Sequence, residues 1–361
     1  MGAKSKGFTL VELLITLAMT AIIAASVYGI FGVQTVRNAA EERTIQMQQG
    51  ARVAIEMIAQ DLRSAGFWGL GNPEAQNTVR GGRSSDSSTN IFLGMAPIQG
   101  LNDLAADNAF PAKSGTDLLV VSFADGDREI LTIRDQNGVE RESEEEPINN
   151  VDFPVPTRIN NSSEKVKWIG QIALAIAADG QTASIFQITN VTKKSADNFA
   201  RLKHVTNNTG DRVKPANWTG AITNPFASGT SIFPMKLKYY WVTPQNELKL
   251  GMGFYDSSGK QFKPYLENGV WQHKAQTIAE HIEDLQFEYG EDTFGDGNYD
   301  GTPDQWVTAD AVSDWRHVIA VKVELLARTS REEKDYIDRT YGDHYRHFRI
   351  ERTIALRNRM P

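Results

Sequence analysis

Residues 7–33 read GFTLVELLITLAMTAIIAASVYGIFGV, and Glu12 is the only charged residue among them. The uncharged part from Leu13 to Val33 is long enough, at about 1.5 Å per residue, to cross the roughly 30 Å of hydrocarbon in a bilayer. Lys4 and Lys6 precede it, and basic residues before a first span keep that end in the cytoplasm. This stretch therefore predicts a membrane-spanning helix followed by an exported chain.

A cleaved secretory signal peptide is the main alternative, because it also has a basic start and an apolar core. Such a core is shorter and ends at a small-residue cleavage site, for which residues 24–26 (AAS) are a weak candidate. The apolar run continues past them through residues 27–31. This continuation favours a span that stays in the mature protein.

An apolar stripe continues the helical pattern beyond the span. Its members recur mostly at three- and four-residue steps, as expected for one face of a helix: Val36, Ala40, Met47, Ala51, Ile55, Ile58, Leu62 and Ala65. The first proline is Pro73. We predict one continuous helix over 8–65, apolar all round over 8–33 and amphipathic over 34–65. A membrane anchor followed by a separate coiled segment uses the same residues and is the alternative.

From Asp117 onward the apolar period changes to two, which predicts β-strands. We predict antiparallel hairpins between 118–123 and 128–133, between 171–178 and 182–191 across the turn residues Asp179 and Gly180, and between 231–242 and 247–254. Alternation returns over 284–290, 317–329 and 347–358. The predicted fold class is α+β, a long N-terminal helix packed on a mainly antiparallel sheet domain over 66–361, in one lobe or two.

Composition excludes several classes of function. The chain has 361 residues, a formal net charge of −7 and no cysteine. An acidic balance argues against a generic nucleic-acid binder, and the lack of cysteine rules out disulfides and thiolate metal sites. GGRSSDSS at residues 81–88 lacks the lysine of a phosphate loop. Because no catalytic motif is evident, we predict a protein that is not an enzyme.

The N-terminal residues resemble a known signal. KGFTLVELLITLAM, residues 6–19, is similar to the class III signal of type IV prepilins, with a basic leader ending at Gly7, then Phe8, then Glu12 inside the apolar helix. In that family a prepilin peptidase cuts between Gly7 and Phe8 and methylates the new amine of Phe8. The resemblance implies that residues 1–7 are a leader and that a type IV pilin-like fold follows.

This resemblance also explains the carboxylate of Glu12. A lone charged carboxylate in hydrocarbon costs about 2.5–3.5 kcal/mol on insertion scales. Cleavage would create an amine at Phe8, one helical turn from Glu12. The resemblance implies that the amine of a neighbouring subunit takes that place in a filament, where Glu12 directs assembly. The alternative is that Glu12 lies among the lipid headgroups and pairs with nothing.

Further stretches resemble the PilW family of minor pilins. They are DLRSAGFWG (61–69), YYWV (239–242), FEYGEDTFGDGNYDGTPDQW (287–306), DWRHVIAVKVELLART (314–329) and ERTIALRNRM (351–360). The resemblance implies a minor pilin of a tip or initiation complex that primes polymerisation. Its partners would be the prepilin peptidase, the major pilin, other minor pilins and a tip adhesin. Before assembly it would lie in the bacterial inner membrane with its C-terminal domain in the periplasm, and afterwards at the pilus tip.

Two other functions remain open at this point. A J-class pseudopilin of type II secretion shares the leader and the fold with a PilW-like protein. A membrane-anchored surface adhesin or binding protein could use the same span, since loops of an exported domain commonly carry binding residues.

One loop has the spacing of a calcium site. Asp296, Asn298, Asp300 and Asp304 stand at positions 1, 3, 5 and 9 of an oxygen-ligand calcium loop, with Gly301 at position 6. The glutamate expected at position 12 is replaced by Val307. The segment is therefore either a Ca²⁺ loop carried by strands or an ion-free acidic turn, since Asp, Asn and Gly form turns readily.

Overall fold

The computed structural model describes residues 9–67, 75–77, 97–106, 111–125, 130–133, 152–193, 198–204, 226, 228–256, 261–263, 266–267, 270–271, 275–293, 300–334 and 336–358. The chain divides into two compact units. The first unit comprises Met1–Gln49 and Arg328–Phe348, and the second comprises Gly50–Ala327 and Arg349–Pro361.

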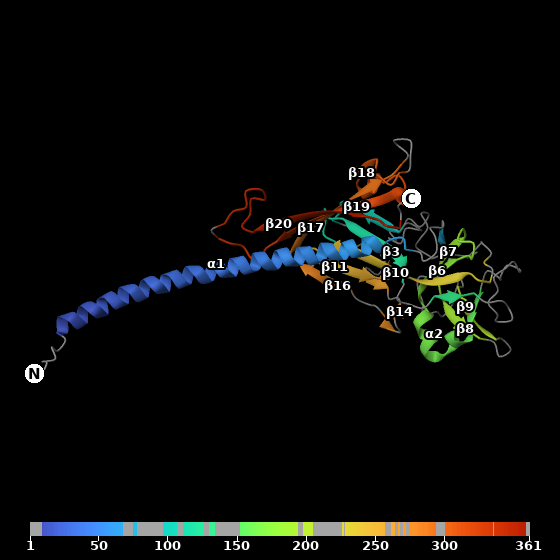
Figure 1. The fold of residues 1–361 in the computed structure, drawn as a ribbon, viewed down its shortest axis with the longest axis horizontal. Coiled ribbons are helices and arrows are strands. Elements are labelled where there is room, and N and C mark those ends of the chain that lie inside the picture. Colours follow the sequence, from blue (N-terminus) through green and yellow to red (C-terminus); the bar gives the residue numbers. More distant parts are fainter. Residues whose placement is uncertain are drawn as a thin grey trace, which may run out of the picture. The chain divides into compact units, whose positions relative to one another are not determined.

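The N-terminal helix α1 covers Leu10–Ser64 (Figure 1). It is about 80 Å long at 1.5 Å per residue, and it confirms the predicted continuous helix. α1 stops where Gly66 takes φ +71°, a left-handed conformation that commonly ends helices. The Gly66 amide donates to the Ser122 carbonyl at 3.2 Å. The end of the helix is therefore bonded to Ser122 of the second unit.

Only the later part of the apolar stripe of α1 is buried by the described chain. Ala51, Ile55, Ile58 and Leu62 are at most 2% exposed, whereas Val36 is 69% exposed. The described part of the chain covers the predicted stripe only from about Met47 onward. The apolar period alone does not tell how much of a helix its own chain covers.

The first unit also contains a loop between the last two strands. Arg346 forms a two-pronged ion pair with Glu333, with Nε–Oε1 at 3.0 Å and Nη2–Oε2 at 2.9 Å. The ring of His347 lies between two carboxylates, Nδ1 at 3.4 Å from Asp338 and Nε2 at 3.5 Å from Asp343. These contacts join Glu333, Asp338 and Asp343 of the loop to Arg346 and His347.

The main sheet is built around β10 (Ser231–Val242). β6 and β4 pair with the start of β10, and β3 and β11 pair with its later part, all antiparallel. β1 joins β7 in parallel at one end of the sheet. The remaining strands of this sheet are β1 (Ala75–Asn77), β2 (Ile98–Leu101), β3 (Leu118–Ala124), β4 (Leu131–Thr132), β6 (Ile172–Ile176), β7 (Ala183–Gln187), β11 (Glu247–Met252) and β16 (Gln276–Glu280).

Two of the three predicted hairpins are confirmed. β6 and β7 pair across a turn in which Gly180 has φ +68° and Asp179 accepts the Gln181 amide. β10 and β11 pair across a turn with Asn246 at φ +60°. The hairpin between 118–123 and 128–133 is wrong, because β3 and β4 both pair with β10. The long strand β10 pairs with the two segments at different places along its length.

The second sheet has the order β18-β17-β19-β20. Its strands are β17 (Ile282–Glu291), β18 (Gln305–Val307), β19 (Val318–Arg328) and β20 (His347–Ala355), and the short helices η2 (Ala309–Ala311) and η3 (Trp315–His317) connect β18 to β19. Phe287 and Tyr289 of β17 stand opposite Val323 and Val321 of β19. All four side chains are at most 1% exposed, so the period-two pattern at the C-terminal end is confirmed.

A three-stranded sheet, β5-β9-β8, forms a further part of the second unit. Its elements are β5 (Asp152–Pro156), η1 (Thr157–Asn160), α2 (Ser162–Trp168), β8 (Asn190–Thr192) and β9 (Phe199–Lys203). Phe153, Trp168, Phe186 and Leu202 share a buried cluster at this sheet. Two short hairpins, β12 (Phe254–Asp256) with β13 (Gln261–Lys263) and β14 (Leu266–Glu267) with β15 (Val270–Trp271), complete the described elements.

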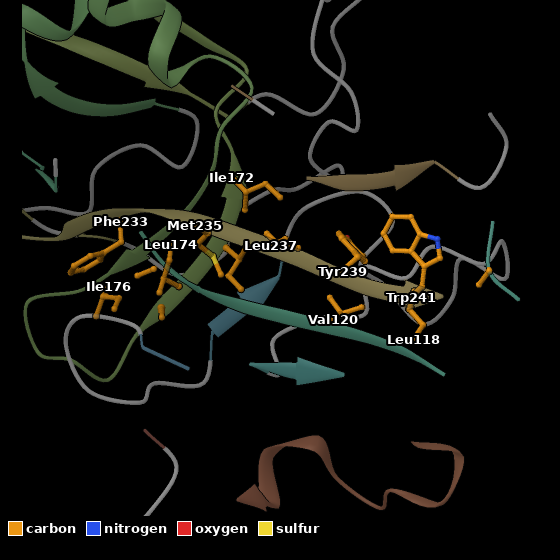
Figure 2. Packing of buried hydrophobic residues seen from close by; sticks show 14 of the residues in the cluster. Leu118, Val120, Ile172, Leu174, Ile176, Phe233, Met235, Leu237, Tyr239 and Trp241 are labelled. Atoms are coloured by element: carbon orange, nitrogen blue, oxygen red, sulfur yellow. The ribbon is translucent and has the colours of Figure 1, made fainter. Parts of the chain in front are cut away.

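The core of the main sheet is formed by alternate residues of β10 and its neighbours. Phe233, Met235, Leu237, Tyr239 and Trp241 point to one face of β10, and Figure 2 shows them beside residues of β3 and β6. Because successive side chains of a strand alternate between faces, the opposite face carries Lys238 and Tyr240. Lys238 and Tyr240 on this second face contact Asp61 near the end of α1.

Candidate functional site

The N-terminus of α1 carries a capping box. The backbone amide and the hydroxyl of Thr9 both donate to Oε2 of Glu12 at 3.0 Å, and the Glu12 amide donates to the Thr9 hydroxyl at 3.3 Å. This reciprocal arrangement satisfies amides that a helix start leaves unpaired. Glu12 therefore has a partner within its own chain, which the sequence interpretation missed although the T-x-x-E pattern signals it. Gly7 and Phe8 lie outside the described residues.

Polar side chains further along the span bond to their own helix. The hydroxyls of Thr16, Thr20 and Ser26 donate to carbonyls three or four residues earlier, at 2.7–3.0 Å. Polar groups in hydrocarbon need such internal partners. The first part of α1 is therefore compatible with an apolar environment, with Glu12 as its only charged side chain.

The same part of α1 exposes a continuous apolar surface. By length and composition this helix is apolar enough to cross a membrane, and none of its most apolar segment is buried within the described chain. The large apolar side chains that are 44–83% exposed are Leu10, Val11, Leu13, Leu14, Ile15, Leu17, Met19, Ile22, Ile23, Val27, Tyr28, Ile30 and Phe31. Exposed apolar surface of this extent marks a membrane or interaction site. Lipid or equivalent helices would cover it.

The C-terminal end of α1 is held by a buried carboxylate. Asp61 is 7% exposed; Oδ1 is 2.7 Å from Nζ of Lys238, and Oδ2 accepts a hydrogen bond from the Tyr240 hydroxyl. Burial is the main cause that raises the pKa of Tyr240, and the charge of Asp61 adds to it. The Tyr240 hydroxyl therefore stays protonated and acts as a donor to Asp61.

The closing strand reaches the same end of the helix. Arg352 of β20 forms an ion pair with Glu56, and the Asn358 side-chain amide donates to the Ala65 carbonyl at 3.0 Å. Asp61 lies in the stretch DLRSAGFWG and Tyr240 in YYWV. Arg352 and Asn358 lie in ERTIALRNRM. The structure thus brings together three of the stretches that the sequence singled out, although they lie far apart along the chain.

The predicted calcium loop is only partly described. Asp296 and Asn298 lie outside the described residues. Asp300 Oδ1 accepts the Thr302 amide at 2.8 Å, and Asp304 Oδ2 accepts the Thr293 amide at 2.7 Å. Within the described residues alone, no group of three or more His, Cys, Asp or Glu side chains is arranged to hold a metal. The calcium loop stays a prediction.

Comparisons with known families give two matches. Residues 2–28 match the model of the prokaryotic N-terminal methylation motif. Residues 261–358 match the model described as Type IV Pilus-assembly protein W. No curated protein and no solved structure matched the chain. The first match covers most of the predicted leader, the capping box and much of the exposed apolar surface, and the second covers the four-stranded sheet.

Proposed function

Because this chain is a PilW-like type IV pilin, we propose that it is a minor pilin that takes part in a tip or initiation complex and primes pilus polymerisation. The observation that carries this proposal is the exposed apolar part of α1, which precedes a sheet domain attached to the other end of the helix. Pilin domains are structural, so the proposed role is assembly and not catalysis.

The proposed assembly step begins with processing. Prepilin peptidase would cut between Gly7 and Phe8 and methylate Phe8, which leaves a charged amine next to the capping box of Thr9 and Glu12. The pairing of Glu12 with Thr9 lowers the cost of holding the carboxylate in lipid, about 2.5–3.5 kcal/mol for a lone charge. In the filament the amine of a neighbouring subunit would replace Thr9 as the partner of Glu12.

The proposed location follows from the charges around the span. Lys4 and Lys6 precede the apolar segment, and we place this end in the cytoplasm and the sheet domain in the periplasm. After extraction from the inner membrane, α1 would pack against the helices of the major pilin and other minor pilins. The sheet domain would contact other minor pilins and a tip adhesin. The PilW match supports a pilus over a type II secretion pseudopilus as the assembly.

The test compares helix variants in the organism that makes the pili. Glu12→Ala and Glu12→Gln should be processed and stay in the membrane, yet be missing from sheared pili on immunoblots. Thr9→Ala should reduce incorporation less, because it removes the internal partner and leaves the carboxylate. Glu42→Ala is the matched control, since Glu42 is an exposed helix residue outside the span and should be incorporated normally.

Two further measurements decide the role. Mass spectrometry of the membrane-bound protein should give a mature chain beginning at methylated Phe8. A deletion strain should make few pili, counted by electron microscopy. A deletion strain with normal pilus numbers would contradict the priming role, and normal incorporation of Glu12→Ala would contradict the role of the carboxylate.

A further inference from the structure

The β19–β20 loop, residues 329–346, lies against α1. It belongs to the same compact unit as the first part of the helix, and Met47 of α1 is buried in that unit. Glu333 is the main cause that raises the pKa of Arg346, and the charge of Glu41 on α1 adds to it. The loop therefore reaches the helix close to where the predicted span ends.

The loop is a short extension of the β19–β20 pair. The Thr329 amide donates to the Arg346 carbonyl at 2.9 Å, and the Asp338 amide donates to the Asp343 carbonyl at 2.8 Å. The chain reverses between Asp338 and Asp343, where Gly342 has φ +73°. Figure 1 shows the loop running beside α1 toward the N-terminal end of the helix.

The turn at the end of the loop is within reach of a membrane that α1 would cross. Glu41 follows Val33, the last residue of the predicted span, by eight residues, or about 12 Å of helix. The three residues from Arg346 back to Asp343 extend the loop by up to about 10 Å. The headgroup layer adds roughly 5–8 Å on each side of the hydrocarbon. The turn would therefore lie at about the level of the lipid headgroups.

Most acidic side chains of the loop are turned inward. The side chains of Glu333, Asp338 and Asp343 are 14%, 14% and 35% exposed. Glu333 pairs with Arg346 at 2.9 Å. Asp338 and Asp343 lie on either side of the His347 ring. These carboxylates are therefore engaged within the loop and contribute little negative charge to its outer face.

The outward side chains are mainly basic and apolar. Lys334 and Arg339 are exposed, and Ile337 and Tyr341 are 62% and 37% exposed. Ile337 is the most exposed large apolar side chain that the structure describes outside α1. Glu332 is the one exposed acidic side chain among the loop's described residues. Basic residues beside exposed apolar and tyrosine side chains are the combination that binds the surface of anionic membranes.

We propose that the outer face of the β19–β20 loop, formed by Lys334, Ile337, Arg339 and Tyr341, binds the surface of an anionic phospholipid membrane beside the span of its own chain. The two basic side chains would contact lipid phosphates. Ile337 and Tyr341 would enter the interfacial layer, where tyrosine is favoured. This inference rests on the proposed membrane stage of the protein. The contact would hold the loop at the membrane surface until the chain is extracted for assembly.

The test reads the depth of the loop in proteoliposomes that contain the full chain. Because the chain has no cysteine, Thr340→Cys provides a single site for an NBD fluorophore at the exposed turn and leaves the proposed contact residues in place. Doxyl-labelled lipids should quench this probe in vesicles of about three parts phosphatidylethanolamine to one part phosphatidylglycerol. Quenching should be much weaker in phosphatidylcholine vesicles. A probe in the span, at Thr20→Cys, should be quenched in both.

Substitutions on the Thr340→Cys background identify the contact residues. Lys334→Gln, Arg339→Gln and Ile337→Ser should each lower the ratio of membrane-bound to free loop about fivefold, the effect of one basic or partly buried apolar side chain at an interface. Glu332→Gln is the matched control, because it changes an exposed charge of the same loop and should not lower the quenching.

The two probes separate this proposal from the proposed function. Quenching at Thr20→Cys without quenching at Thr340→Cys would overturn the loop contact and leave the span intact, whereas no quenching at Thr20→Cys would contradict the membrane stage as well. Equal quenching of the loop probe in the two lipids would also overturn the proposal, and so would wild-type quenching in all three variants. A second chain on this face would give a signal that rises with the protein-to-lipid ratio in either lipid, and that result would overturn the lipid contact.

Discussion

Asp61 is the residue whose removal should detach the end of α1 from the main sheet. Asp61→Ala leaves the ammonium of Lys238 and the hydroxyl of Tyr240 without their shared partner. The side chains of Asp61 and Lys238 are only 10% and 20% exposed, so water restores little of the lost interaction. Removing one partner of a buried ion pair costs about 3–5 kcal/mol. We expect the free energy of unfolding to fall by that amount.

The assay is thermal and urea unfolding of the full chain in detergent, followed by circular dichroism. A loss of about 3–5 kcal/mol corresponds to a melting temperature lower by roughly 6–15 °C. Glu288→Ala is the matched control, because it removes a carboxylate from an exposed ion pair with Lys322, at 2.6 Å and with side chains 47% and 29% exposed. Surface pairs of this kind contribute about 0–1 kcal/mol.

A double substitution separates the lost pair from lost packing. Asp61→Asn keeps an acceptor for the Tyr240 hydroxyl, and Lys238→Met removes the cation that would otherwise stay unpaired. The double variant should lose less stability than the sum of the two single variants, because residues in one network couple by about 0.5–3 kcal/mol. If the free energy of unfolding of Asp61→Ala lies within about 1 kcal/mol of that of Glu288→Ala, the buried ion pair does not hold α1 to the sheet and the prediction is refuted.

Two buried groups should make stability depend on pH in opposite directions. Burial raises the pKa of Asp117 to about 6, although the Asp103 and Phe287 amides that bond to it act to lower it. The stability that Asp117 contributes is therefore present below about pH 4, and about 3 kcal/mol of it is lost as the pH rises through 6. Asp117→Asn should abolish this dependence of the unfolding free energy on pH, measured by urea unfolding from pH 4 to 7. Burial lowers the pKa of His204 to about 4, and the centroid of its ring lies 4.9 Å from that of Phe153. The stability that neutral His204 contributes is present above pH 6.5, and about 3 kcal/mol of it is lost as the pH falls toward 4. His204→Phe should remove that acid sensitivity, and curves parallel to the wild type would contradict the assignment in either case.

The parts of the fold that the sequence predicted correctly depend on local patterns. The continuous helix follows from uninterrupted apolar periodicity, and the β6–β7 hairpin follows from Asp179 and Gly180, whose side chain and backbone favour a tight turn. The error at 118–133 has a different origin. Leu118–Ala124 and Leu131–Thr132 both pair with β10, about a hundred residues later in the chain, and a local pattern contains no information about that partner.

The residues of the candidate site also differ in whether the sequence alone could indicate them. Thr9 was available from the sequence, because the capping box is a four-residue signature. Asp61 was not, since an acidic residue in an amphipathic helix normally faces water and its partners lie in a distant strand. Long-range contacts and burial are the information that the sequence lacks.

The two carboxylates near the ends of α1 differ in the range of their contacts, and this difference bears on the proposed assembly. Glu12 bonds to a residue three positions away, so it can change partner without disturbing the rest of the fold. Asp61 bonds to side chains of β10, so it cannot change partner unless the helix separates from the sheet. Assembly by helix packing needs a replaceable contact where subunits join and a fixed one where the helix carries its domain.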